Sequence, residues 1–121
     1  MKIAVTIWGN RVSPVFDAAK KLLVVDLKKQ KITNKQYLSF DPGSIEDVIG
    51  LLKNMQINTL ICGAITSRPT ELLTENDIEL IPFVSGEALE LIDALAKKVD
   101  VGKTYIMPGC RPSTLSGKEK L

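Results

Sequence analysis

The chain has 121 residues and a mass of 13.3 kDa, with 45% hydrophobic and 25% charged residues. These values are typical of one globular domain with an ordinary core, and they exclude an intrinsically disordered chain. The formal net charge of +2 does not indicate nucleic-acid binding, because Lys and Arg are spread along a chain that also holds 14 acidic residues.

The first half of the chain is predicted to form three strands. Residues 1–8 are rich in Ile, Val and Ala, which favours a buried central strand, and the turn residues of GNRVSP then end it. A second apolar run at 22–27 leads through KKQK, a predicted hairpin tip, to a more polar third strand at 32–40. Its polarity places this third strand near the edge of the sheet.

The second half alternates helices with strands. Ser44 and Asp47 resemble a capping box for a helix whose apolar residues recur at helical spacing up to Met55. The remaining elements are predicted as a strand at 60–63, a short helix at 68–76, a strand at 79–83 and a helix that follows Ser85, its candidate N-cap.

The predicted order β-β-β-α-β-α-β-α defines an α/β fold. Short connections imply an antiparallel meander at first, and the later units imply parallel pairing with right-handed crossovers. We therefore expect a mixed five-stranded sheet with helices on both faces. One domain is predicted over residues 1–108, followed by a polar, loosely ordered tail over 109–121.

Three polar loops are predicted to meet at one edge of this sheet. The carboxyl ends of its parallel strands lie together, and ligands of open α/β sheets bind at that edge. Two of the loops lead into helix N-termini, which favour anions, and Arg11 and Arg68 can add bidentate donors. The loops span residues 8–17, 62–69 and 82–87.

Most candidates in these loops also have a structural explanation. Ser67 and Ser85 are expected to cap helices, and Gly63 and Gly86 to satisfy backbone geometry. Arg68 is less expected in a first helical turn, where the dipole prefers acids, so it favours an anionic partner or a solvated position.

The two cysteines, Cys62 and Cys110, are candidate ligands for a soft metal. Cys62 ends a buried strand, where free cysteine is commonly a small hydrophobe, and Cys110 in MPGCRP is expected to be exposed. The two thiols alone do not make a zinc site, which needs three or four protein ligands. A metal–sulfur cluster that brings most of its own ligands needs fewer ligands from the protein.

Catalytic chemistry is disfavoured by the residue types present. The chain has no histidine to act as base for a serine or cysteine nucleophile. Its first strand, KIAVTIW, has no carboxylate to hold the divalent metal of a nuclease. Trp8 is predicted to pack in the core or at its rim. We therefore expect a binding protein and not an enzyme.

The N-terminal sequence and the cysteines also predict a compartment. MKIAVTIW shows no cationic segment followed by a hydrophobic stretch and a cleavage site, and no apolar run approaches the ~18 residues that span a bilayer. We expect a cytoplasmic protein with both thiols free, and no membrane or nucleic-acid partner.

Several motifs resemble those of one protein family. MKIAVTIWGNRVSPVFDAAKKLLVVD, LICGAITSRP, IPFVSG and MPGC are similar to segments of the dinitrogenase iron-molybdenum cofactor biosynthesis family, over nearly all of residues 1–110. The resemblance implies a three-layer, ribonuclease H-like fold. It also implies a protein that binds the iron-molybdenum cofactor, or its iron-sulfur precursor, and passes it from a donor to an acceptor protein without chemical turnover.

Site residues follow from the resemblance by position. They are Arg11, Ser13 and Asp17 in the first loop, residues 62–68 with Cys62, Gly63, Ser67 and Arg68 in the second, and Ser85 and Gly86 in the third. On this hypothesis Cys62 or Cys110 ligates iron, and the arginines offset the negative charge of the cluster. The alternative is a small-anion-binding regulatory module with purely structural cysteines.

Overall fold

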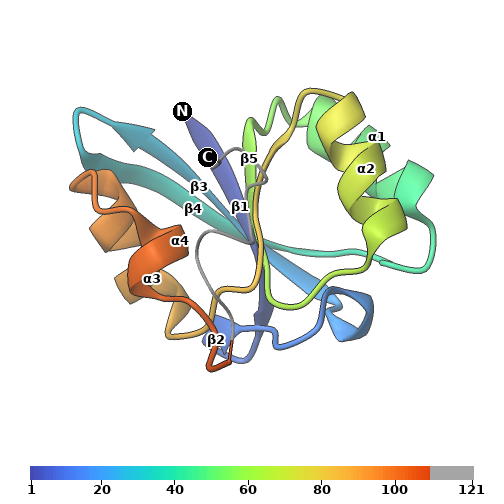
Figure 1. The fold of residues 1–121 in the computed structure, drawn as a ribbon. Helices are drawn as coiled ribbons and strands as arrows, with labels where there is room; N and C mark the ends of the chain where they lie inside the picture. The colour runs from blue at the N-terminus through green and yellow to red at the C-terminus, as the bar shows by residue number, and fades with distance from the viewer. Residues whose placement is uncertain (110–121) are drawn as a thin grey trace.

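A mixed sheet between two helical layers forms the fold in the computed structural model, which describes residues 1–109 (Figure 1). The predicted tail lies outside the described residues, except for its first residue. The strands are β1 (Lys2–Trp8), β2 (Arg11–Val12), β3 (Lys21–Lys28), β4 (Lys31–Ser39), β5 (Thr59–Ile61) and β6 (Glu79–Ile81). The helices are the 3-10 helix η1 (Phe16–Ala18), α1 (Ile45–Asn54), α2 (Ser67–Glu75), α3 (Ala88–Ala96) and α4 (Val101–Thr104).

The sheet has the strand order β4-β3-β1-β5-β6, with the two-residue β2 paired to β1. β3 is antiparallel to both β1 and β4, whereas β1, β5 and β6 run parallel. The predicted meander followed by parallel units is therefore confirmed. β1 lies in the middle of the sheet, and a helical layer covers each of its faces. Its residues 3–7 are therefore all buried, and its sequence is almost entirely apolar.

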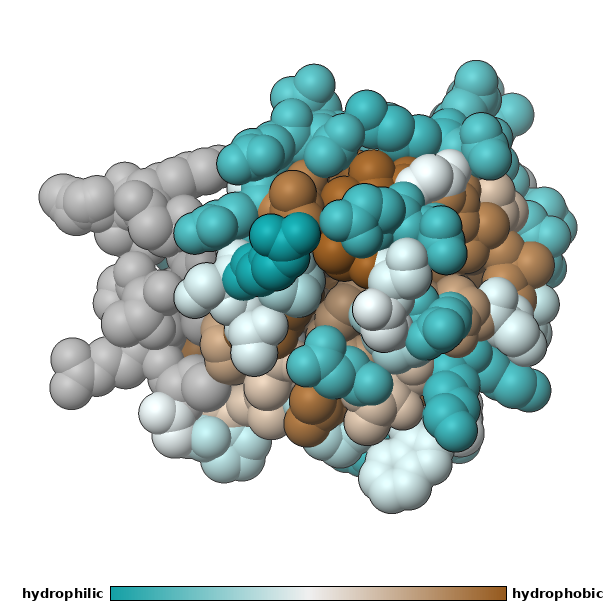
Figure 2. Space-filling view, turned by 90° about the vertical axis from the view of Figure 1, so that its right-hand side faces the viewer, coloured by the Kyte–Doolittle hydropathy of each residue, from teal (hydrophilic) through white to brown (hydrophobic). Residues whose placement is uncertain are grey.

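Alternation along β1 separates two cores. Ile3, Val5 and Ile7 face a core that includes residues of α3 and α4, whereas Ala4 faces a core built on α1 and α2. Figure 1 shows these helix pairs on opposite sides of the sheet. The predicted helices on both faces are thus confirmed. The outer surface on the α1 and α2 side is mostly hydrophilic, with apolar areas in between (Figure 2).

The helix starts differ from the predictions. α3 begins at Ala88 with Glu87 as its N-cap, so the prediction that Ser85 caps this helix is wrong. The reason is a tertiary contact, because the Ser85 N–H donates to the Tyr105 carbonyl and Gly86, at φ 133°, carries the chain through a further turn. Ser67 is the first residue of α2 and Thr66 is its N-cap, without a side-chain hydrogen bond.

Three short elements were not predicted: β2, η1 and α4. Each has between two and four residues, which is too short for hydrophobic periodicity to appear in the sequence. In residues 1–109 the structure has no helix with the length and apolar character needed to cross a membrane.

Candidate functional site

The first and second predicted loops are joined by their backbones. The Ala64 N–H donates to the Pro14 carbonyl and the Phe16 N–H donates to the Ala64 carbonyl, each at 2.8 Å. Val15 and Ala64 form a parallel bridge between these two bonds. The two loops therefore extend the pairing of the sheet beyond the end of β5.

The third loop is joined to both of the others. The Val12 N–H donates to the Gly86 carbonyl at 2.9 Å, which connects β2 to the loop before α3. The Phe83 N–H donates to the Gly63 carbonyl, also at 2.9 Å. The predicted convergence of the three loops is thus confirmed, and it brings together Arg11, Ser13, Gly63, Ser85 and Gly86.

Gly63 is required by a close approach of two backbones. A Cβ at this position would lie 2.3 Å from the Ser13 carbonyl oxygen and 2.4 Å from that of Pro14. Ser13 is buried, and its hydroxyl donates to the Val15 carbonyl at 3.0 Å, which shapes the facing turn. Both residues therefore build the site by positioning its backbone.

We predict that Gly63→Ala will lower the free energy of unfolding by roughly 1–3 kcal/mol or more, because the methyl group overpacks against backbone atoms that cannot rotate away. The control is Gly50→Ala, an exposed position in α1 where a Cβ meets nothing within 4 Å. That change should raise stability by about 0.5–1 kcal/mol through helix propensity. Urea unfolding of both variants checks the pair, and equal stabilities would contradict the close approach.

Cys62 lies in the core and not at the surface of the site. Its side chain is fully buried, in the α1 and α2 core, and burial raises the pKa of the thiol to about 12. The thiolate is the form that ligates iron, and this environment disfavours it strongly. The structure therefore favours the small-hydrophobe interpretation of Cys62 over the metal-ligand one. Cys110, the other predicted ligand, lies outside the described residues.

We predict that iodoacetamide at pH 8 will leave Cys62 unmodified in the folded protein, because the thiol is both inaccessible and protonated. In denaturant the same residue should react fully within the same time. Mass spectrometry of the peptide that contains Cys62 measures both states separately from Cys110. Equal modification of Cys62 with and without denaturant would show that the strand end opens.

The remaining predicted residues are spread over the surface. Arg68 forms an ion pair with Glu46 of α1 at 3.5 Å, with both side chains more than 70% exposed, so the pair adds little stability. Within residues 1–109, no hydrogen bond or ion pair connects Arg68 to the first loop. Asp17 is exposed on η1. Arg11 is exposed on β2, and its backbone forms an isolated antiparallel β-bridge with the backbone of Glu87.

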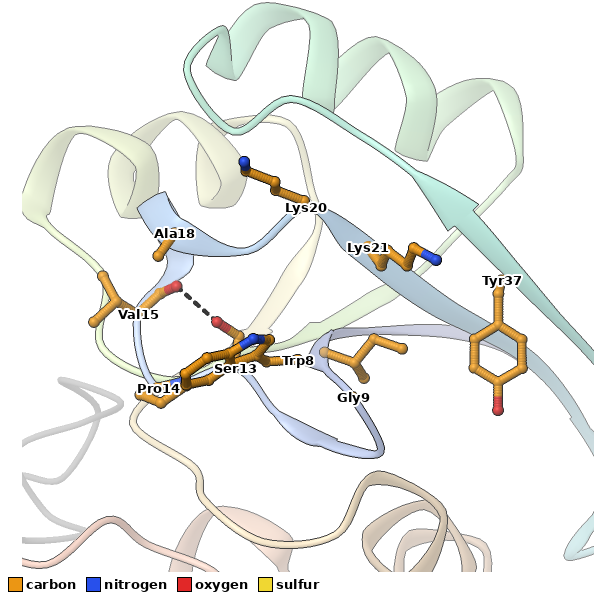
Figure 3. Close-up of a pocket in the computed structure, with 10 residues that line it drawn as sticks. Trp8, Gly9, Ser13, Pro14, Val15, Ala18, Lys20, Lys21 and Tyr37 are labelled. Carbon is orange, nitrogen blue, oxygen red and sulfur yellow. Dashed lines mark hydrogen bonds between the residues drawn. The ribbon is translucent and has the colours of Figure 1, made fainter.

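A groove of about 790 Å³ opens beside the first loop (Figure 3). Three of the exposed large hydrophobic side chains, those of Trp8, Val15 and Tyr37, line it. Trp8 is 75% exposed, so the prediction that it packs in the core or at its rim is wrong. The other lining residues are Ile7, Gly9, Ser13, Pro14, Ala18, Lys20 and Lys21.

The groove combines apolar walls with two lysine residues. Its volume is in the range of small-molecule sites, which are mostly apolar with a few polar groups. Lys20 and Lys21 supply positive charge, and the site residue Ser13 is also in the lining. Sequence reasoning missed both lysines. The available signal was that an antiparallel β3 returns its first residues to the end of β1, as the pairing of Ile7 with Lys21 shows.

Protein ligands for a metal are not gathered in the described part of the chain. Within residues 1–109, no group of three or more His, Cys, Asp or Glu side chains is placed to hold a metal ion. The groups that this edge does present are lysine and arginine side chains next to exposed aromatic surface, and such cations suit an anionic ligand.

The fold and the edge together define an α/β domain that presents a polar loop edge and a cationic groove. The family model described as "Dinitrogenase iron-molybdenum cofactor" matches residues 1–98. The chain therefore belongs to the dinitrogenase iron-molybdenum cofactor family, as its motifs indicate. No match was found among the curated proteins.

Solved structures confirm the fold. The protein PH0822 is similar at a TM-score of 0.74 and 18% identity, over 82% of this chain and 91% of that one. A candidate dinitrogenase from Methanocaldococcus jannaschii is similar at a TM-score of 0.66 and 18% identity, over 81% of this chain and 89% of that one. A candidate NifB protein from Thermotoga is similar at a TM-score of 0.62 and 19% identity, over 79% of this chain and 87% of that one. At these identities the likeness shows the fold alone.

Proposed function

We propose that this protein is a non-catalytic carrier of an anionic iron-sulfur or iron-molybdenum cofactor, or of a precursor, in metallocluster assembly. The observation that supports the proposal most is the groove in which Lys20 and Lys21 lie next to the joined loop edge. Membership of the cofactor family supports the class of cargo. Donor and acceptor proteins for the cluster are then the expected partners, in the cytoplasm.

Charge is the main attraction in this proposal. A cluster with net negative charge gains from the ammonium groups of Lys20 and Lys21 and from the guanidinium of Arg11 near the same loop. The exposed ring of Trp8 and the apolar lining displace water from one side of the cargo and strengthen these interactions. Because the joined loops are held by backbone hydrogen bonds, the site is formed before the cargo arrives.

A carrier must also release its cargo. An attachment that depends on lysine and arginine side chains dissociates more easily than one with several thiolate bonds. Cys110 stays a predicted single thiolate ligand to iron, and the burial of Cys62 argues against that role for Cys62. Arg68, which is paired with Glu46, serves at most as a more distant source of positive charge.

Anaerobic titration with isolated iron-molybdenum cofactor tests the proposal, because Trp8 is the only tryptophan of the chain and reports on the groove. We expect quenching of its fluorescence on binding. The double variant Lys20→Glu/Lys21→Glu should weaken binding about tenfold or more, and added salt should weaken binding by the wild type. Lys97→Glu/Lys98→Glu, an equal charge reversal at the end of α3, is the matched control.

Two outcomes of this titration would overturn the carrier proposal. One is the absence of any change in fluorescence or visible absorption, and the other is equal affinity in the two double variants. Cys110→Ser adds a separate measurement, because loss of a cluster absorption band in that variant shows thiolate ligation. Cys62→Ala should leave binding unchanged.

The second candidate function is a small-anion-binding regulatory module, which the buried, structural Cys62 favours. In that case molybdate or phosphate raises the melting temperature of the protein, as linkage of binding to folding requires. The rise should persist in the double variant Cys62→Ala/Cys110→Ala. It should be absent if the protein binds only intact clusters.

A further inference from the structure

The edge strand β4 is exposed along its middle on both faces. Among the strands of residues 1–109, β4 pairs only with β3, so its outer side presents unpaired backbone N–H and C=O groups. Residues 33–37 are all exposed, although their partners on β3 include the buried Val24 and Val25. Neither helical layer therefore covers this part of the strand.

The opposite edge of the sheet is protected in the usual way. β6 has only three residues, and α2 packs next to it. Short edge strands and covering helices are common means of preventing unwanted strand pairing. β4, with nine residues, has neither of these protections along residues 33–37.

Charge is segregated toward the β3–β4 hairpin, although the chain as a whole is nearly neutral. Residues 18–40 contain six lysines and one acidic residue, whereas residues 41–109 contain five basic and eleven acidic residues. All six lysines are exposed. They are Lys20, Lys21, Lys28, Lys29, Lys31 and Lys35.

Lysines on an edge strand also have a protective effect, and here that effect is selective. If β4 paired with β4 of a second copy, the lysines of both strands would be brought together and would repel. An acidic strand meets no such repulsion and gains from the same charges. Protection alone does not explain Tyr37, which is 56% exposed on this strand and lies on the same face as Lys35.

We propose that β4 is a docking strand for an extended, acidic segment of a partner protein. The segment pairs with the free backbone groups of residues 33–37, as in β-strand addition. Its carboxylates lie on the face of Lys35 and Tyr37, where they meet Lys35 and their aliphatic stems contact Tyr37, while Lys31 adds positive charge at the start of the strand. A peptide backbone is favoured over a nucleic acid because only a peptide satisfies the row of N–H and C=O groups. The inference is independent of the cargo proposed above.

A synthetic nine-residue peptide of alternating Glu and Val tests this inference on the full-length protein. We expect the peptide to shift the backbone amide signals of β4 in proton–nitrogen spectra of the labelled protein. Lys31→Glu/Lys35→Glu should reduce its affinity about tenfold or more, whereas Lys97→Glu/Lys98→Glu should leave the affinity within about twofold. All four lysines are exposed, and the ion pair that the control loses, between Lys97 and Asp93 at 3.1 Å, is exposed as well, so the melting temperatures should stay close to that of the wild type.

Two further probes decide between strand addition and simple charge attraction. In a peptide of alternating Glu and Pro, the proline residues remove N–H groups, so its binding should be much weaker if the backbone pairs. Equal binding of this peptide, or no shift of β4 signals with the Glu–Val peptide, would overturn the proposal. Tighter binding of a single-stranded thymidine oligonucleotide at the same amides would assign the surface to nucleic acid instead. Unchanged cofactor binding by Lys31→Glu/Lys35→Glu keeps this test separate from the carrier test.

Discussion

The approach of the Gly63 backbone to the carbonyls of Ser13 and Pro14 is the constraint on which the binding edge depends. Only a residue without a Cβ allows the two segments to come so close. Their proximity permits the two hydrogen bonds through Ala64, and the Gly63 carbonyl then accepts from Phe83 of the third loop. Three loops that are far apart in sequence thus form one surface.

Much of the fold could be predicted because runs and stripes of apolar residues mark its strands and helices in the sequence. A strand buried on both faces, such as β1, must be apolar throughout, and the helices over it must have one apolar side. Two-residue β2 and four-residue α4 have no such pattern. The turn at Gly86 delays α3 beyond Ser85, and this depends on a distant hydrogen bond to Tyr105 that local sequence does not reveal.

The site could be predicted only to the level of the loops. The end of a strand indicates which residues lie at the edge, but not whether a side chain points into the core or out of it. Cys62 and Trp8 each stand at the end of a parallel strand, yet Cys62 is fully buried and Trp8 is 75% exposed. The difference is set by the neighbours, because Cys62 packs in the α1 and α2 core, whereas Trp8 lies in the groove with the exposed Lys20 and with Lys21, the first residue of β3.

The two proposed surfaces share β3 and β4, and electrostatic screening limits how strongly they can influence each other. β3 has eight residues and spans about 26 Å, so Lys28 and its partner Lys31 lie about three Debye lengths (about 8 Å each at physiological ionic strength) from Lys21, whereas Lys35, opposite Val25, lies about half as far away. Bound negative charge in the groove therefore leaves the attraction of an acidic strand to Lys31 nearly unchanged. Tyr37 is different, because it both lines the groove and belongs to β4. A partner that distinguishes a loaded carrier from an empty one must do so through contacts of this kind, and not through long-range charge.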